Sequence, residues 1–412
     1  MRRVVVTGLG IVSSLGNNKA EVKDSLYEGR SGITFQQEYA DRGLRSHVAG
    51  SIKNLDIEAL IDRKLLRFMA KGHAYAWLAM QEAIADSKLP EELVSNVRTG
   101  LIVGAGGTST ESMLEATNTL AEKGIRRVGP YMVTKTMSSG IAACLATGAK
   151  IKGVNYGISS ACSTSAHCIG AGVEQIQLGK QDIVFAGGGE EEHWTMSFLF
   201  DAMGALSSKY NETPEKASRT YDADRDGFVI SGGGGILVLE EYEHAKASGA
   251  KIYCEIAGQG LSSDGYHIAA PDPSGAGVQR AVKFALRDAE LTTADIVHLN
   301  AHATSTPAGD VAEANALRAA LGKDADHVAV SATKSMTGHL LGGAGAIESV
   351  FIVKTLQDRM APPTINIENL DPAVTLDVVR DKPRALPAGD IAALNDSFGF
   401  GGHNVVLVFK SI

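Results

Sequence analysis

The sequence contains too few cysteines for a fold held together by disulfides. Its 412 residues include only four, Cys144, Cys162, Cys168 and Cys254, and none forms a Cys-x-x-Cys pair. Proteins that rely on disulfides use them more densely, so we expect free thiols, one of them a candidate reactive group. Free thiols are typical of the cytoplasm, and we expect that location.

Long apolar runs and an excess of positive charge are missing as well. No stretch of about 18 apolar residues occurs, and Thr7 and Gly8 interrupt the basic, apolar start before it resembles a signal peptide. Lys and Arg number 39 against 47 Asp and Glu, which gives a formal net charge of −8. Because nucleic-acid binding requires a cationic surface, we expect no nucleic acid as a partner. Because no long apolar run occurs, we expect no membrane as a partner either.

Glycine is abundant, and the remaining composition is that of a large globular protein. The 46 glycines, against 11 prolines, cluster beside apolar runs, which is typical of tight turns and close backbone packing. Hydrophobic residues make up 44% of the chain and charged residues 21%. These values favour a sizeable core and exclude a mainly disordered chain.

Short apolar runs alternate with stretches long enough for helices, which predicts an α/β fold. The expected strands are residues 3–8, 101–105, 182–186, 235–239, 252–257, 296–300, 328–331 and 404–409. The segment from about 30 to 95 has no such run, and we interpret it as an insertion.

Three segments recur in the same order in the two halves of the chain. Residues 158–170 match 330–342, and residues 104–110 match 300–306. A Gly-Gly pair also precedes the apolar runs at 236–239 and 405–408. This order predicts a duplicated α/β unit with halves at 1–250 and 251–412, of which the first carries the insertions.

Cys162 lies between a predicted strand and a predicted helix. The helix N-terminus offers free N–H groups and partial positive charge, which lower a thiol pKa and stabilise an oxyanion. A buried, inert cysteine is the alternative, but the serines and threonines at 159–165 are more polar than a packing site needs.

The repeat places Lys334 opposite Cys162 and His302 opposite Gly106, while His339 recurs opposite His167. Because a pseudo-twofold relation brings equivalent loops together, we expect Cys162, His302, Lys334 and His339 to meet in one pocket. A structural role is an equal alternative for either of these two histidines, and His167 is interpreted as structural.

Two other kinds of site are not expected. The glycines at 232–235 lack the strand-to-helix context and the Lys-Ser/Thr of a phosphate-binding loop. Histidines and cysteines do not occur at metal-ligand spacing, so no metal is predicted.

The chain resembles the β-ketoacyl-(acyl carrier protein) synthases of the thiolase superfamily, most closely the bacterial type I condensing enzymes. The likeness covers nearly the whole chain and rests on four segments: Ser-Ala-Cys-Ser-Thr-Ser at 160–165, Asn-Ala-His-Ala-Thr-Ser-Thr-Pro-Ala-Gly-Asp at 300–310, Lys-Ser-Met-Thr-Gly-His at 334–339 and Asn-Asp-Ser-Phe-Gly-Phe-Gly-Gly at 395–402. It implies a thiolase-like fold in α/β/α/β/α layers.

The resemblance implies a decarboxylative condensation between an acyl group on the Cys162 thiol and malonyl-carrier protein. His302 and His339 would stabilise the enolate, and the N–H groups of Cys162 and Phe400 would form the oxyanion hole. Lys334 and Glu313 would organise the electrostatics of the site rather than transfer protons. A simple ion pair is the alternative for each of them.

The same resemblance assigns substrate contacts. Thr304 and Thr306 would hold the phosphopantetheine arm of the carrier, and no cofactor would be permanently bound. Met137 and Phe200 would line the acyl pocket, with Met137 reaching across a homodimer; core packing is the alternative. Ala303, Asp396 and His403 depart from the commonest family pattern without removing a catalytic group.

Basic residues form two clusters that would suit an acidic acyl carrier protein. Arg63, Arg67 and Lys71 fall at i, i+4 and i+8, on one face of a predicted helix that Lys64 borders. Arg126 and Arg127 form the second cluster. Ordinary solvated helix faces are the alternative.

Two other functions fit part of this pattern. A thiolase or coenzyme A-dependent condensing enzyme would share the fold and the cysteine, but the paired histidines favour decarboxylative chemistry. A non-catalytic chain-length partner would be expected to lack the nucleophile, so Cys162 argues against it.

Overall fold

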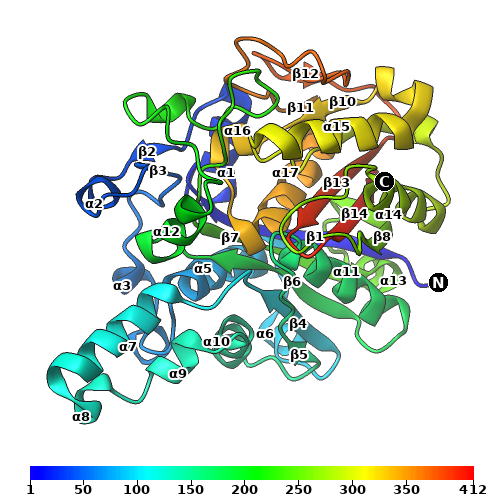
Figure 1. Ribbon diagram of the computed structural model, residues 1–412. Coiled ribbons are helices and arrows are strands. Elements are labelled where there is room, and N and C mark those ends of the chain that lie inside the picture. The colour runs from blue at the N-terminus through cyan, green and yellow to red at the C-terminus, as the bar shows by residue number, and fades with distance from the viewer.

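The computed structural model describes residues 1–412, and a ten-stranded sheet dominates it (Figure 1). Along the sheet the strands run in the order β10-β9-β13-β14-β8-β1-β7-β6-β4-β5. Their bounds are β1 (Val4–Ser13), β4 (Thr99–Gly104), β5 (Asn155–Tyr156), β6 (Ile183–Glu190), β7 (Gly233–Glu241), β8 (Cys254–Ser263), β9 (Ile296–Asn300), β10 (Ala329–Ser331), β13 (Ala392–Gly399) and β14 (His403–Lys410).

Each half of the sheet repeats one topology. From the centre outward, the first half runs β1-β7-β6-β4-β5 and the second runs β8-β14-β13-β9-β10. In both halves the first two pairings are antiparallel and the outer two are parallel. The halves meet where Val5 and Val6 of β1 pair with Glu255 and Cys254 of β8. The duplicated unit predicted from the sequence is therefore confirmed.

The long helices form three layers around the two half-sheets. Helices α11 (Thr164–Gln177) and α17 (Ala344–Asp358) lie between the halves and contact strands of both. Helices α5 (Lys71–Ser87) and α10 (Gly140–Ala149) cover the outer face of the first half, and α14 (Ala276–Asp288) and α15 (Pro307–Leu321) that of the second. Three separate apolar clusters fill these interfaces. This arrangement is the predicted α/β/α/β/α architecture.

The remaining elements are short or peripheral. The helices are α1 (Lys19–Glu28), α2 (Gln37–Asp41), α3 (Ile57–Leu60), α4 (Arg63–Leu66), α6 (Glu91–Val94), α7 (Thr110–Lys123), α8 (Ile125–Val128), α9 (Met132–Thr136), α12 (Trp194–Ala202), α13 (Tyr242–Ser248) and α16 (Lys334–Thr337). The short strands are β2 (Thr34–Phe35), β3 (Val48–Ala49), β11 (Met360–Ala361) and β12 (Arg384–Ala385). None of the helices combines the length and apolar character needed to cross a bilayer.

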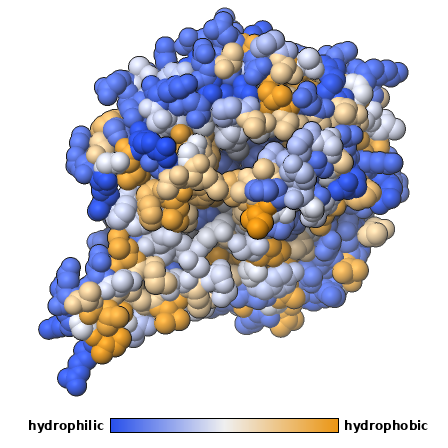
Figure 2. Space-filling view, in the orientation of Figure 1, coloured by the Kyte–Doolittle hydropathy of each residue, from blue (hydrophilic) through white to orange (hydrophobic).

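The structure corrects the predicted insertion. Helix α5 lies within the segment 30–95, yet it packs on β1 and β7 as α14 packs on β8 and β14, so it belongs to the repeated unit. Helices α7, α8 and α9 instead project from the body, at the lower left of Figure 1. Their exposed apolar side chains form part of the orange surface in Figure 2, and include Met113, Leu120, Ile125 and Val133.

Candidate active site

Cys162 lies in the loop between β5 and α11, immediately before the N-cap residue Ser163. Ala161 adopts a left-handed backbone conformation, with φ of 52°, and so turns the chain sharply at the cysteine. The Ser163 hydroxyl donates to the carbonyls of Ser397 and His403, which fixes this turn against the second half of the molecule. The position at a helix N-terminus agrees with the sequence analysis.

Cys162, His302 and His339 converge from three separate loops. His339 Nε2 lies 3.1 Å from Cys162 Sγ, and the rings of His302 and His339 stand nearly perpendicular, 5.3 Å apart between centroids. One ligand-type atom from each of the three side chains lies within 4.8 Å of the others. This spacing would also suit a metal ion, so the absence of a metal stays a prediction.

Both histidines are neutral near pH 7. Burial and the charge of Lys334 hold the pKa of each well below 6.5, and His339 lowers that of His302 further. The Nδ1 atoms of both rings are buried without a hydrogen-bond partner in the protein. Neutral rings suit hydrogen bonding to an anion that develops during a reaction, because they do not carry a charge beforehand.

The thiol pKa differs from the sequence expectation. Removal of the thiol from water raises the pKa of Cys162 to about 11, although the Lys334 charge and the N–H groups of Phe400 and Cys162 act in the opposite direction. The helix N-terminus therefore does not lower the resting pKa as we expected, because desolvation outweighs it.

Two backbone N–H groups, those of Phe400 and Cys162, are aimed at the sulfur. Phe400 follows Gly399, the last residue of β13, and a Cβ at Gly399 would lie 2.8 Å from the Ser160 carbonyl and 3.2 Å from the Cys162 nitrogen. Glycine at this position is required by the close approach of the two chains. The pair of N–H groups has the arrangement of an oxyanion hole.

Lys334 lies close enough for its charge to act on both histidines, and it forms a buried ion pair with Glu348 of α17. Both side chains are 1% exposed. Glu348 was absent from the sequence analysis, although it is the one charged residue in the apolar stretch 344–353. A single charge inside such a run is itself a sign of a buried partner.

Glu313 and Asp396 support the His302 backbone. The His302 N–H donates to both carboxylates, at 2.8 Å to Glu313 Oε1 and 2.6 Å to Asp396 Oδ1, and the Ala303 N–H donates to Glu313 Oε2 at 2.6 Å. Asp396 Oδ2 is buried without a partner. Burial raises the pKa of Asp396 to about 8 and that of Glu313 well above its usual value, and their mutual repulsion adds to the shift of Glu313.

Asp396→Asn should therefore stabilise the protein in a pH-dependent way. The carboxyl ionises near pH 4 in the unfolded chain but near pH 8 in the folded one, so the cost of burying it grows between those values. We expect the variant to gain about 2 kcal/mol of unfolding free energy at pH 8 and little at pH 5, by urea denaturation. A variant less stable than the wild type at pH 8 would contradict this reasoning.

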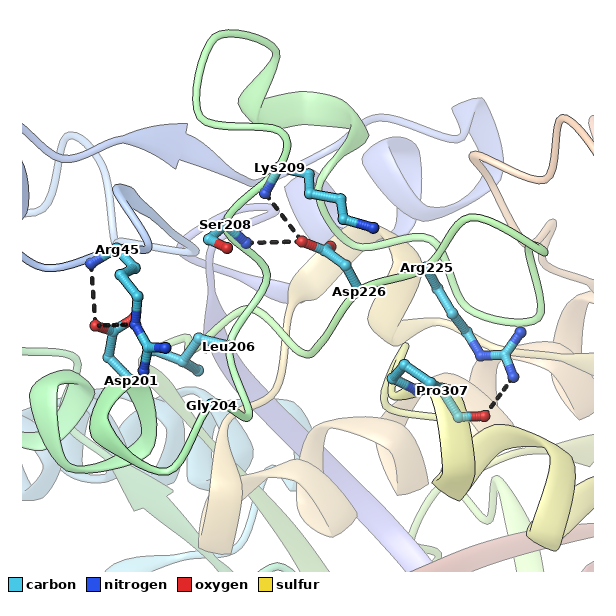
Figure 3. A pocket seen from close by; sticks show the side chains of 9 residues that line it. All are labelled: Arg45, Asp201, Gly204, Leu206, Ser208, Lys209, Arg225, Asp226 and Pro307. Carbon is cyan, nitrogen blue, oxygen red and sulfur yellow. Dashed lines mark hydrogen bonds and ion pairs between the residues drawn. The ribbon is translucent and has the colours of Figure 1, made fainter.

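Thr304 and Thr306 precede α15 and are half-buried, with their hydroxyl oxygens 3.1 Å apart. Next to them lies a pocket of about 290 Å³, drawn in Figure 3, whose wall includes Pro307, Arg225 and Leu206. Arg225 donates to the carbonyls of Thr306 and Pro307. The remaining lining residues are Arg45, Asp201, Gly204, Ser208, Lys209 and Asp226.

Phe200 lies near the reactive cluster. The Phe200 ring stands 5.2 Å from Phe228 and 6.4 Å from Phe400, and Phe228 stands 5.4 Å from the His339 ring. Phe200 and Cys162 also pack against the same small apolar cluster. Met137 is half-buried at the C-terminal end of α9.

The basic residues are exposed, but one of the two predicted clusters has a different geometry. Arg63 and Lys64 belong to the short helix α4, which ends at Leu66 with Arg67 as its C-cap. Lys71 begins a separate helix, α5, and forms an ion pair with Glu111 at 2.9 Å. The prediction that Arg63, Arg67 and Lys71 share one helix face is therefore wrong, because α4 ends after a single turn. Arg126 and Arg127 lie exposed on α8.

Comparison with known proteins identifies the family. Residues 1–245 match the family described as beta-ketoacyl synthase, N-terminal domain, and residues 253–368 match beta-ketoacyl synthase, C-terminal domain. The chain belongs to the β-ketoacyl synthase family. It is a condensing enzyme of the acyltransferase class, and its thiolase-like fold is confirmed.

Relatives of this β-ketoacyl synthase extend over its full length. The chain is 55% identical to 3-oxoacyl-(acyl-carrier-protein) synthase 1 of Escherichia coli strain K12, with 100% of both chains covered. It is 53% identical to the Haemophilus influenzae protein of the same name, over 100% of this chain and 99% of that protein. A crystal structure of a β-ketoacyl synthase from Burkholderia phymatum, 35% identical, superposes with a TM-score of 0.92 over 100% of both chains. The resemblance to type I synthases is confirmed.

Proposed function

We propose that the protein is a 3-oxoacyl-(acyl carrier protein) synthase of fatty acid elongation. It joins an acyl group held as a thioester on Cys162 to the two-carbon unit left when malonyl-carrier protein loses carbon dioxide. The observation that carries this proposal is the convergence of one thiol, two neutral imidazoles and two N–H groups. The test is the stoichiometry of carbon dioxide and 3-oxoacyl product formed from acyl- and malonyl-carrier protein.

In the first half-reaction, Cys162 attacks the carbonyl carbon of the acyl thioester. The thiol proton leaves as attack proceeds, and His339 Nε2, 3.1 Å from the sulfur, is the neighbouring group able to take it. The N–H groups of Cys162 and Phe400 stabilise the tetrahedral oxyanion. The carbon–sulfur bond to the carrier then breaks, and the phosphopantetheine thiolate takes that proton from His339, which returns the ring to its neutral form. Lys334 favours the Cys162 thiolate by its positive charge.

In the second half-reaction, malonyl thioester occupies the same site and loses its carboxylate as carbon dioxide. The electron pair of that bond forms an enolate whose oxygen faces the neutral His302 and His339 rings. Hydrogen bonds from these rings stabilise the negative charge, which raises the decarboxylation rate. The enolate carbon then attacks the Cys162 thioester, and the sulfur leaves as a thiolate. No permanently bound cofactor takes part.

The substrate arm is proposed to run past Thr304 and Thr306. Their hydroxyls lie on the loop that follows β9 and carries His302, so an arm bound to them delivers its thioester to the histidines. Pro307, which follows Thr306, lies in the wall of the pocket drawn in Figure 3. An arm along this loop would carry the thioester from a carrier docked outside to the half-buried Cys162.

The carrier protein is proposed to dock on Arg63, Lys64 and Arg67 together with Arg126 and Arg127. These exposed cations stand out in a chain of net charge −8 and would attract an acidic partner. One structural relative was determined as an acyl-carrier protein in complex with its ketosynthase, at 31% identity and a TM-score of 0.88. That relative supports docking of a carrier on this fold.

Arg63→Glu combined with Arg67→Glu should raise KM for acyl-carrier protein by about tenfold, because two attractive charges become repulsive. Its salt dependence should flatten. Turnover of a short pantetheine thioester, which does not need the docking surface, should stay near the wild-type value. Steady-state kinetics with both substrates checks this, and equal losses for both would assign the cluster to the fold or the pocket.

The acyl pocket is proposed to extend from Cys162 toward Phe200, with Met137 contributed by the second subunit. Phe200→Ala opens space beside Phe228 and Phe400, so we expect the preferred acyl primer to lengthen. The measurement is the product distribution with a series of primers on a protein whose folding is verified by circular dichroism. An unchanged distribution would assign Phe200 to plain core packing.

We also propose a homodimer in the cytoplasm. The exposed apolar side chains of α7 to α9 are the kind that a second copy covers, and α9 leads into Met137. Four free thiols suit a reducing compartment. The two functional halves are proposed to divide near residue 250, which agrees with family matches that end at 245 and resume at 253.

A further inference from the structure

Glu190 is a buried carboxylate for which the reaction described above has no role. It is the last residue of β6, pairs with Gly233 of β7, and is 2% exposed. No basic side chain forms an ion pair with it, and burial raises its pKa to about 8. Burying a carboxylate without a cation is costly, so its retention calls for a compensating set of contacts.

One oxygen of Glu190 joins the two halves of the molecule. Its Oε2 accepts the Gly106 N–H at 2.7 Å and the Gly342 N–H at 3.0 Å. Gly106 follows β4 in the first half, and Gly342 precedes α17 in the second. The two loops touch, because a Cβ at Gly342 would lie only 2.0 Å from the Gly106 nitrogen. A carboxyl oxygen accepts both N–H groups in either protonation state, so Glu190 holds the loops together by geometry.

Each of these loops is linked to one partner of the catalytic pair. The Gly106 carbonyl accepts from the Ser159 hydroxyl at 3.2 Å, on the loop that continues to Cys162. Gly342 follows His339 by three residues, and the intervening Leu341 has a left-handed φ of 49°. Leu341 also belongs to the apolar cluster on which Cys162 packs. A shift between the loops would therefore move Cys162 relative to His339.

We propose that Glu190 is a positioning residue that sets the separation of Cys162 Sγ and His339 Nε2 by binding the loops at Gly106 and Gly342 to each other. It does not touch the substrate and exchanges no proton. Its importance for turnover rests on the proposed function, whereas its effect on the separation does not.

The neighbouring Glu191 provides a matched control. It is 3% exposed, also carries a buried carboxylate, and accepts from the Ser109 hydroxyl at 2.7 Å and the Glu111 N–H at 3.2 Å. All of these partners belong to the first half. Substitution of Glu191 therefore removes a similar charge without separating the two loops.

The experiment compares Glu190→Met and Glu190→Gln with Glu191→Met and Glu191→Gln in the full-length protein. Methionine keeps the length of the side chain but accepts no strong hydrogen bond, whereas glutamine keeps one carbonyl oxygen for both N–H groups. We expect Glu190→Met to lower kcat by about 100-fold and to widen the sulfur–nitrogen separation by about 1 Å in a crystal structure. Glu190→Gln should lose less kcat. KM for malonyl-carrier protein should stay within about twofold for both, since Glu190 does not touch the substrate.

The Glu191 variants should keep the separation of 3.1 Å and most of kcat. A Glu190→Met structure with an unchanged separation overturns the proposal whatever the activity, and so does an equal loss of kcat in Glu191→Met. If Glu190→Met does not fold, the decision passes to Glu190→Gln, for which unchanged kcat and separation overturn it. Failure of the wild type to condense would refute the function but leave the crystallographic test intact.

Discussion

Cys162→Ala should abolish covalent loading while leaving the fold intact. The side chain lies on a loop before α11 and supplies the sulfur that receives the acyl group, so no thioester can form without it. Condensation should fall by about 10³-fold or more, because loss of a nucleophile removes the covalent route. Intact-protein mass spectrometry after incubation with acyl-carrier protein should show one acyl adduct on the wild type and none on the variant.

Cys168→Ala is the matched control for this prediction. Cys168 lies in α11, one turn after the helix begins at Thr164, but is fully buried and faces the central core. It should retain loading, and both variants should have far-ultraviolet circular dichroism like the wild type. An acyl adduct on Cys162→Ala, mapped to Cys168 or Cys144, would overturn the assignment of the nucleophile.

Replacement of either histidine should separate decarboxylation from acyl loading. His302→Ala and His339→Ala each remove a neutral ring that would face the enolate, so malonyl decarboxylation should fall by about 10²- to 10⁴-fold. Loading should fall less, and least in His302→Ala, because His339 is the ring that contacts the sulfur. Release of labelled carbon dioxide and acylation of Cys162 are measured on the same preparations.

His298→Ala controls for the loss of a buried imidazole. His298 lies on β9, and its Nδ1 pairs with the Ala329 carbonyl at 2.8 Å, away from the sulfur. It should keep decarboxylation once any loss of stability is corrected for. Retention of decarboxylation in both His302→Ala and His339→Ala would show that other groups carry the developing charge.

The sequence predicted the repeated fold well, because apolar strands alternate with helices in both halves. All eight predicted strands occur, but two strands of the main sheet were missed. Strand β5 has only two residues, and in β13 Asn395, Asp396 and Ser397 are polar and yet fully buried. A search for apolar runs does not find a strand in which polar residues occupy the buried positions. Helix α5 was mistaken for an insertion because its partner strands lie far from it in sequence.

The convergence of Cys162, His302 and His339 was predictable from the repeat, whereas the electrostatics around them were not. Equivalent loops of the two halves do bring Cys162, His302 and His339 together. The second half, however, places the turn α16 before its long helix, so Lys334 precedes α17 by ten residues while Cys162 precedes α11 by two. Desolvation of the thiol depends on packing that no local pattern encodes. The single charge of Glu348 in an apolar run indicates a buried partner but does not identify it as Lys334.

The docking surface shows a similar limit. Spacing of i, i+4 and i+8 predicted a shared helix face for Arg63, Arg67 and Lys71, but α4 and α5 are separate helices. The three cations are exposed, as the sequence predicted, but they do not lie on one helix face. Charge composition therefore indicated a basic surface, and only the tertiary structure gave its shape.

The measurement that tests decarboxylative condensation most directly is a single-turnover reaction of acylated wild-type protein with malonyl-carrier protein labelled at the free carboxyl. The account predicts one labelled carbon dioxide for each 3-oxoacyl product and simultaneous loss of the acyl group from Cys162. Product formed without labelled carbon dioxide, or loss of the acyl group without chain extension, would contradict it.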